Sequence, residues 1–121
     1  MTKSKINLKS KLESIKDYWS PKVIAELNNY QFKLAKIKDE FIWHEHNDTD
    51  EAFIVIKGNI EIELEDRTIE LSEGEMFVVP KGAKHKPLAR GEAHILLIEP
   101  RGVKNTGDIE NELTAKNDIW I

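Results

Sequence analysis

The first twenty residues show hydrophobic side chains at helical spacing. Every third or fourth residue is hydrophobic in this stretch: Leu8, Leu12, Ile15 and Trp19. Such spacing places the side chains on one face of a helix. Pro21 ends the pattern, because the residue before a proline disfavours the helical region. The pattern predicts an amphipathic helix near residues 5–18, packed on the outside of the structure that follows.

After Pro21 the hydrophobic positions alternate with polar ones, which is typical of strands. Residues 23–27 and 30–34 flank Asn28-Asn29, and asparagine tolerates the positive φ angles of a tight hairpin turn. In the second of these segments the hydrophobic residues Tyr30, Phe32 and Leu34 alternate with Gln31 and Lys33. We therefore expect a β-hairpin whose second strand turns Gln31 and Lys33 toward solvent.

From residue 41 onward, short strand-like segments recur every eight to twelve residues. We predict strands at residues 41–46, 51–56, 59–64, 68–71, 75–79, 84–88 and 93–98. Turn-forming residues separate them, including Lys38-Asp39-Glu40 before the first and Arg90-Gly91 before the last. Many short strands separated by turn-forming residues favour an all-β sandwich or barrel over alternating strands and helices.

Length and composition indicate one globular domain. With 121 residues, we expect a helical arm at 1–20, a β-barrel at 21–100 and an irregular tail at 101–121 that Ile109, Leu113 and Trp120 hold against the barrel. The net charge of −4 argues against a nucleic-acid partner. The apolar runs are too short for a membrane span, and the start has no apolar core of a secretory signal, so we expect a cytoplasmic protein.

The absence of cysteine leaves histidine and carboxylates as the candidate metal ligands. His44 and His46 are two residues apart on a predicted strand, so both imidazoles point to one face. Glu51 opens the next strand, which runs back antiparallel beside them, and His85 lies on a later strand. Three imidazoles and one carboxylate would form a divalent-metal site with room for a water molecule or a substrate. Manganese, iron, cobalt, nickel, copper and zinc all accept these ligands.

The same residues form two blocks that resemble the paired motifs of the cupin superfamily. The first block is His44-x-His46, four residues, Glu51, six residues and Gly58; the second is Gly74, five residues, Pro80-x-Gly82, two residues and His85. The resemblance implies a double-stranded β-helix, the jelly-roll barrel of cupins, and a metal held by His44, His46, Glu51 and His85. Two positions depart from the motifs, since Lys38 and Ala89 stand where the family commonly has glycine and asparagine.

Some alternatives stay open at this point. Asp50 competes with Glu51 as the carboxylate ligand, while His94, outside both motifs, is expected to be structural rather than a ligand. The chain is similar to small single-domain cupins described as mannose-6-phosphate-isomerase-like. This similarity suggests an enzyme of dioxygenase, decarboxylase, isomerase or lyase type acting on a small oxygen-bearing metabolite, or alternatively a non-catalytic small-molecule-binding or sensing module. A homodimer is also expected, because an edge hairpin at 22–34 and an amphipathic helix can be buried against a second copy.

Overall fold

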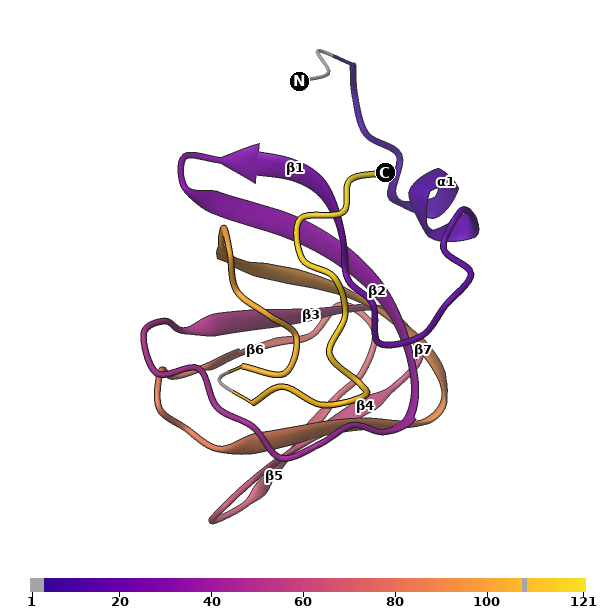
Figure 1. Ribbon diagram of the computed structural model, residues 1–121. Coiled ribbons are helices and arrows are strands. Elements are labelled where there is room, and N and C mark those ends of the chain that lie inside the picture. Colours follow the sequence, from indigo (N-terminus) through magenta and orange to yellow (C-terminus); the bar gives the residue numbers. More distant parts are fainter. Residues whose placement is uncertain (1–3, 108) are drawn as a thin grey trace.

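The computed structural model describes residues 4–107 and 109–121, which form one short helix and a rolled antiparallel sheet (Figure 1). The elements are α1 (Leu8–Glu13), β1 (Lys22–Leu27), β2 (Tyr30–Glu40), β3 (Glu51–Lys57), β4 (Ile60–Leu64), β5 (Thr68–Leu71), β6 (Met76–Val79) and β7 (His85–Pro100). The strand order is β1-β2-β7-β3-β6, and β4 pairs with both β7 and β5. The predicted all-β barrel with an N-terminal helix is confirmed.

The last strand, β7, organises the barrel. The sequence predicts two strands at 84–88 and 93–98, but the structure has a single strand that bends near Arg90-Gly91. Its first half pairs with β4, its second half pairs with β3, and β2 follows both halves along the other edge. One long bent strand therefore joins the two halves of the barrel, and the predicted break at Arg90-Gly91 is wrong.

The predicted turn at residues 38–40 is also wrong, because these residues continue β2. The register of β2 against β7 shifts between Ile37 and Asp39, and Asp39 has a φ of 64°. An irregularity of this kind bends a strand without ending it. The turn-forming residues identified here mark a bend in β2, which lets it follow the bent β7.

The predicted strand at 41–46 does not form. Two contacts with β7 remain: Phe41 N donates to Pro87 O at 3.0 Å, and His44 exchanges both backbone hydrogen bonds with His85. Pro87 has no N–H with which to return the bond from Phe41, so a continuous ladder is not possible. The segment consequently crosses the end of the barrel as irregular chain with one bridge at His44.

The two faces of β2 are opposite to the prediction. Gln31 and Lys33 point inward and are 0% and 3% exposed, whereas Leu34 is buried on the outer face beneath α1. The outer cluster contains Leu12, Ile15, Ile24 and Leu34. The alternation correctly predicts a β-strand. It misleads about which face is buried, because α1 covers the outside of the sheet and both faces of this strand are buried.

The helix is shorter than predicted. Asn7 caps its start by accepting a hydrogen bond from Ser10 N at 3.0 Å, and the helix ends at Glu13. Trp19 lies beyond it with a φ of 60° and stacks on Phe41, with ring centroids 4.6 Å apart. This tryptophan belongs to the barrel, although its spacing had placed it on the helix.

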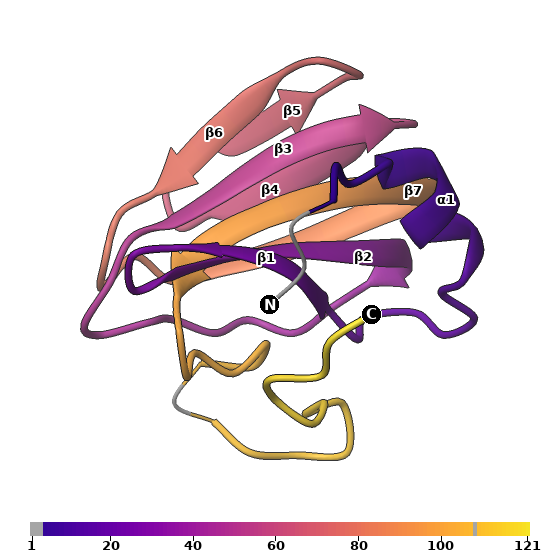
Figure 2. The same ribbon diagram turned by 90° about the horizontal axis from the view of Figure 1, so that it is seen from above.

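The C-terminal tail, residues 101–107 and 109–121, runs as irregular chain across one end of the barrel (Figures 1 and 2). The three expected anchors are exposed: Ile109 by 47%, Leu113 by 38% and Trp120 by 46%. The tail is instead held by backbone hydrogen bonds of Val23 with Ile119 and Ile121. Along the described chain, no helix is long and apolar enough to span a membrane.

Candidate metal centre

Three parts of the chain bring His44, His46, Glu51 and His85 to one place inside the barrel. The two histidines before β3 lie on the irregular segment that follows β2, Glu51 is the first residue of β3, and His85 is the first residue of β7. All four side chains are buried, and one potential ligand atom from each lies within 4.8 Å of the others. The structure thus assembles the four residues that the motifs select.

Backbone carbonyls orient two of the imidazole rings. Nδ1 of His44 lies 2.9 Å from Ile42 O, and Nδ1 of His85 lies 2.9 Å from Ala83 O. A carbonyl oxygen can only accept, so Nδ1 donates the hydrogen bond in both rings, which leaves Nε2 as the nitrogen available to a metal. This is the tautomer in which Nε2 coordinates a metal.

Three atoms of the cluster are buried without a hydrogen-bond partner among the described residues: His46 Nε2, His85 Nε2 and Glu51 Oε1. Glu51 Oε1 lies 3.2 Å from His46 Nε2 and 3.4 Å from His85 Nε2. Buried polar atoms rarely remain unpaired in folded proteins. Two atoms bound at about 2.2 Å to one ion lie at most about 4.4 Å apart. The separations in the cluster, none above 4.8 Å, are close to those of atoms that share one ion.

The protonation states also suit a cation. Burial, together with the neighbouring His85, lowers the pKa of His44 to about 4, so its imidazole is neutral at neutral pH. Burial alone would raise the pKa of Glu51, but its contacts with His46, His85 and Glu99 hold that pKa well below the usual range. At neutral pH the centre thus presents a carboxylate and a neutral His44 imidazole.

The alternative candidates lie elsewhere. Asp50 is exposed, and its Oδ1 accepts a hydrogen bond from Lys81 N at 2.8 Å, which ties two turns together. His94 lies farther along β7, where Nε2 is 2.8 Å from Glu92 Oε2. Neither residue belongs to the buried cluster.

Two functional-site neighbours were missed in the sequence: Lys33 and Glu99. Both are buried, and Lys33 Nζ lies 2.7 Å from Glu99 Oε2. Burial raises the pKa of Glu99 well above its usual range, and the adjacent Glu51 adds to the effect. Glu99 does share strand parity with the hydrophobic Ile95 and Leu97, which is a usable signal for an inward side chain. Lys33 shares parity with Ala35 and Ile37, but the hydrophobic Phe32 and Leu34 on the opposite parity mask this signal, because the strand is covered on both faces.

A small cavity of about 30 Å³ lies against the cluster, and His44 and Glu51 form part of its wall. This volume holds about one or two water molecules. The remaining wall is mainly hydrophobic: Trp19, Pro21, Ala35, Ile37, Phe41, Phe53, Pro87, Ile95, Leu97 and Asn105. The backbone oxygen of Trp19 accepts a hydrogen bond from the Asn105 side chain at 2.9 Å, so the tail holds this part of the wall in place.

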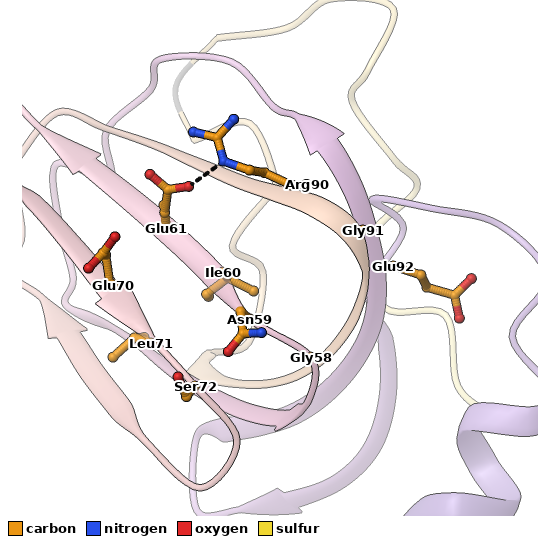
Figure 3. A pocket seen from close by; sticks show the side chains of 10 residues that line it. All are labelled: Gly58, Asn59, Ile60, Glu61, Glu70, Leu71, Ser72, Arg90, Gly91 and Glu92. Atoms are coloured by element: carbon orange, nitrogen blue, oxygen red, sulfur yellow. Dashed lines mark hydrogen bonds and ion pairs between the residues drawn. The ribbon is translucent and has the colours of Figure 1, made fainter.

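A larger hollow of about 460 Å³ lies at the bend of β7 (Figure 3). It contains the ion pair between Arg90 and Glu61, whose nitrogen and oxygen are 3.1 Å apart. None of the four cluster residues lines it. This hollow is therefore separate from the candidate metal centre.

Comparison with known proteins agrees with this site. The family model of the cupin domain matches residues 32–99, which include all four cluster residues. The chain belongs to the cupin family. This cupin is 33% identical over 81 residues to the protein YdbB of Bacillus subtilis, an alignment that covers 66% of this chain and 72% of YdbB.

Solved structures extend the similarity to most of this cupin. A cupin-2 domain containing protein from Shewanella frigidimarina is 54% identical with a TM-score of 0.78, covering 79% of this chain and 94% of that one. Protein NMB1881 from Neisseria meningitidis is 35% identical with a TM-score of 0.74, covering 80% of this chain and 99% of that one. The motif resemblance is confirmed at the level of the family.

Proposed function

We propose that this cupin holds a divalent metal ion through His44, His46, Glu51 and His85, and that the ion binds a small oxygen-bearing metabolite on which the protein acts. The observation that supports this most directly is the convergence of three unpaired buried ligand atoms, Nε2 of His46 and His85 and Oε1 of Glu51. Four protein ligands leave about two positions open on a six-coordinate ion.

The residues of the chain would hold and shield the metal. Carbonyl contacts orient two imidazoles, and the hydrophobic wall of the adjacent cavity excludes bulk water. When bound, a divalent ion supplies Lewis-acid polarisation of an oxygen ligand, and iron or copper would add redox chemistry. A reaction of dioxygenase, decarboxylase, isomerase or lyase type is compatible with this arrangement.

A second candidate is a non-catalytic module that binds or senses a small molecule through the same ion. The composition of the cavity favours it: apart from His44 and Glu51, no described residue in the cavity wall is titratable. Proton transfer there would depend on the metal ligands themselves. Turnover of any small oxygen-bearing compound by the metal-loaded protein would exclude this second candidate.

The metal can be tested directly. Protein purified without an affinity tag is subjected to elemental analysis, and metal-free protein is titrated with Co²⁺ and Zn²⁺. We expect one ion per chain, and we expect His46→Ala to weaken binding by at least about 100-fold. His94→Ala is the matched control and should bind as the wild type does. Absence of metal from both the purified and the titrated wild type would refute the proposal.

The oligomeric state and the location are further proposals. We propose a homodimer in the cytoplasm. The proposed dimer is supported by the edge position of β1 in the sheet, since the described tail bonds to this strand only at Val23 and leaves the rest of its edge open. Light scattering at micromolar concentration tests the dimer, and a monomeric mass would refute it.

A further inference from the structure

A buried ion pair lies directly behind the candidate metal centre. Lys33 Nζ is 2.7 Å from Glu99 Oε2 and 3.2 Å from Val103 O, and both side chains are at most 3% exposed. Glu99 lies beside Glu51 on the neighbouring strand β3, since the register places Ala52 opposite Ile98. Neither Lys33 nor Glu99 lines the cavity beside the cluster.

The three side chains lie in a row across neighbouring strands. Lys33 is on β2, Glu99 is on β7 and Glu51 is on β3, which is the order of these strands in the sheet. The register pairs Gln31 with Glu99, so Lys33 is a diagonal neighbour of Glu99 on the inner face. Since Ala52 is opposite Ile98, Glu51 lies beside Glu99 on the other side of β7. The row continues from Glu51 to the imidazoles of His46 and His85.

We propose that Lys33 and Glu99 are positioning residues of the metal centre: they fix the Glu51 carboxylate so that its free oxygen faces the ion, and Lys33 also fastens the tail to the centre through Val103. This inference rests on the metal-binding function proposed above. It adds two residues that do not touch the ion and assigns each of them a role.

The buried Lys33–Glu99 pair is not what stability alone would select. Burying two charges costs desolvation, and hydrophobic side chains of similar volume often stabilise a protein equally well or better. The pair is therefore weakly explained by stability. Glu99 Oε1 is, moreover, buried without a hydrogen-bond partner among the described residues. Residues behind a ligand set its orientation, and their loss typically weakens metal binding by about 10–100-fold.

The experiment compares five proteins: the wild type, Lys33→Met, Glu99→Gln, the double variant Lys33→Met/Glu99→Met, and the control Lys36→Met. Lys36 is on the same strand but donates to Ile15 O outside the barrel at 2.8 Å. Each protein is measured for Co²⁺ affinity by competition with a chelator, for the visible absorption spectrum of bound Co²⁺, and for urea unfolding in EDTA.

We expect both single variants to bind Co²⁺ at least about tenfold more weakly than the wild type, with a changed Co²⁺ spectrum. The double variant removes both buried polar groups together, so its unfolding midpoint in EDTA should return to that of the wild type while its affinity and spectrum remain altered. Lys36→Met should match the wild type in affinity and spectrum.

Two outcomes would overturn the inference. If the double variant binds Co²⁺ with wild-type affinity and spectrum, the pair has a structural role only, and the proposed metal function stands. If the wild type itself binds no Co²⁺, the proposed function fails and this inference fails with it. The conservative Glu99→Gln variant preserves side-chain volume, so its affinity and spectrum decide the matter even where a larger change prevents folding.

Discussion

Gly107 lies where the tail meets the loop that contains two candidate metal ligands. A Cβ atom at this position would be 2.1 Å from the backbone oxygen of Glu45, the residue between His44 and His46. Gly107 also has a φ of 67°, in the left-handed region that side chains disfavour. Gly102, in the same tail, has a φ of 94° but nothing within 4 Å of its Cβ position, and it serves as a matched control.

The two alanine variants should differ by the cost of the steric clash. Both lose about 1–2 kcal/mol from the left-handed backbone. In Gly107→Ala the new methyl group and Glu45 O must also separate by about 1.3 Å to reach an ordinary 3.4 Å contact. Overpacking of this kind costs roughly a further 1–3 kcal/mol. We therefore expect a loss of about 2–5 kcal/mol for Gly107→Ala and about 1–2 kcal/mol for Gly102→Ala.

Urea unfolding of the metal-free proteins measures this difference, and Co²⁺ competition measures its effect on the site. Because the clash displaces the backbone between two candidate ligands, Gly107→Ala should bind Co²⁺ at least about tenfold more weakly, while Gly102→Ala binds normally. Equal unfolding free energies for the two variants would show that the tail does not press on the ligand loop, and the reasoning would be refuted.

Three further predictions follow from the packing and charges described above. The folded state holds the pKa of His44 at about 4, below its unfolded value near 6.5. The free energy of unfolding of the metal-free protein should therefore fall by about 3 kcal/mol as the pH falls from 6.5 to 4. Urea titrations in EDTA that show no such dependence on pH would contradict this. Leu34→Ala, between α1 and the sheet, should cost about 2–5 kcal/mol by urea unfolding, whereas Leu27→Ala at an exposed position should cost less than about 0.5 kcal/mol. Glu51→Gln should weaken Zn²⁺ binding in calorimetry by at least about 100-fold and Asp50→Asn should not; the reverse result would make Asp50 the ligand.

The sequence was sufficient for the fold class and for the four clustered residues, because both depend on local spacing. Short strand-like segments between turn-forming residues identified β3 and β4, and the two motif blocks selected His44, His46, Glu51 and His85. These signals do not depend on which element covers which face of the sheet.

The sequence-based predictions that are wrong concern residues whose structure is set by tertiary contacts and not by the local pattern. Lys33 alternates with hydrophobic neighbours, as a solvent-facing residue would, but α1 covers the opposite face and Glu99 Oε2 accepts a hydrogen bond from its ammonium group inside the barrel. Trp19 has helical spacing but stacks on Phe41. The segment 41–46 has strand-like composition, but it cannot form a continuous hydrogen-bond ladder with β7 because Pro87 has no N–H. Each of these outcomes depends on a partner that is distant in the sequence.

The last strand in the sequence, β7, lies in the middle of the sheet, which has a consequence for how the protein folds. During synthesis β1 to β6 emerge before the strand that pairs with β2, β3 and β4, and the register joins residues as distant as Tyr30 and Pro100. Pairings this distant slow folding, and the waiting strands expose hydrophobic surface that favours aggregation. Recombinant production should consequently benefit from low temperature, which weakens hydrophobic association, and the four clustered residues can come together only after His85 has been synthesised.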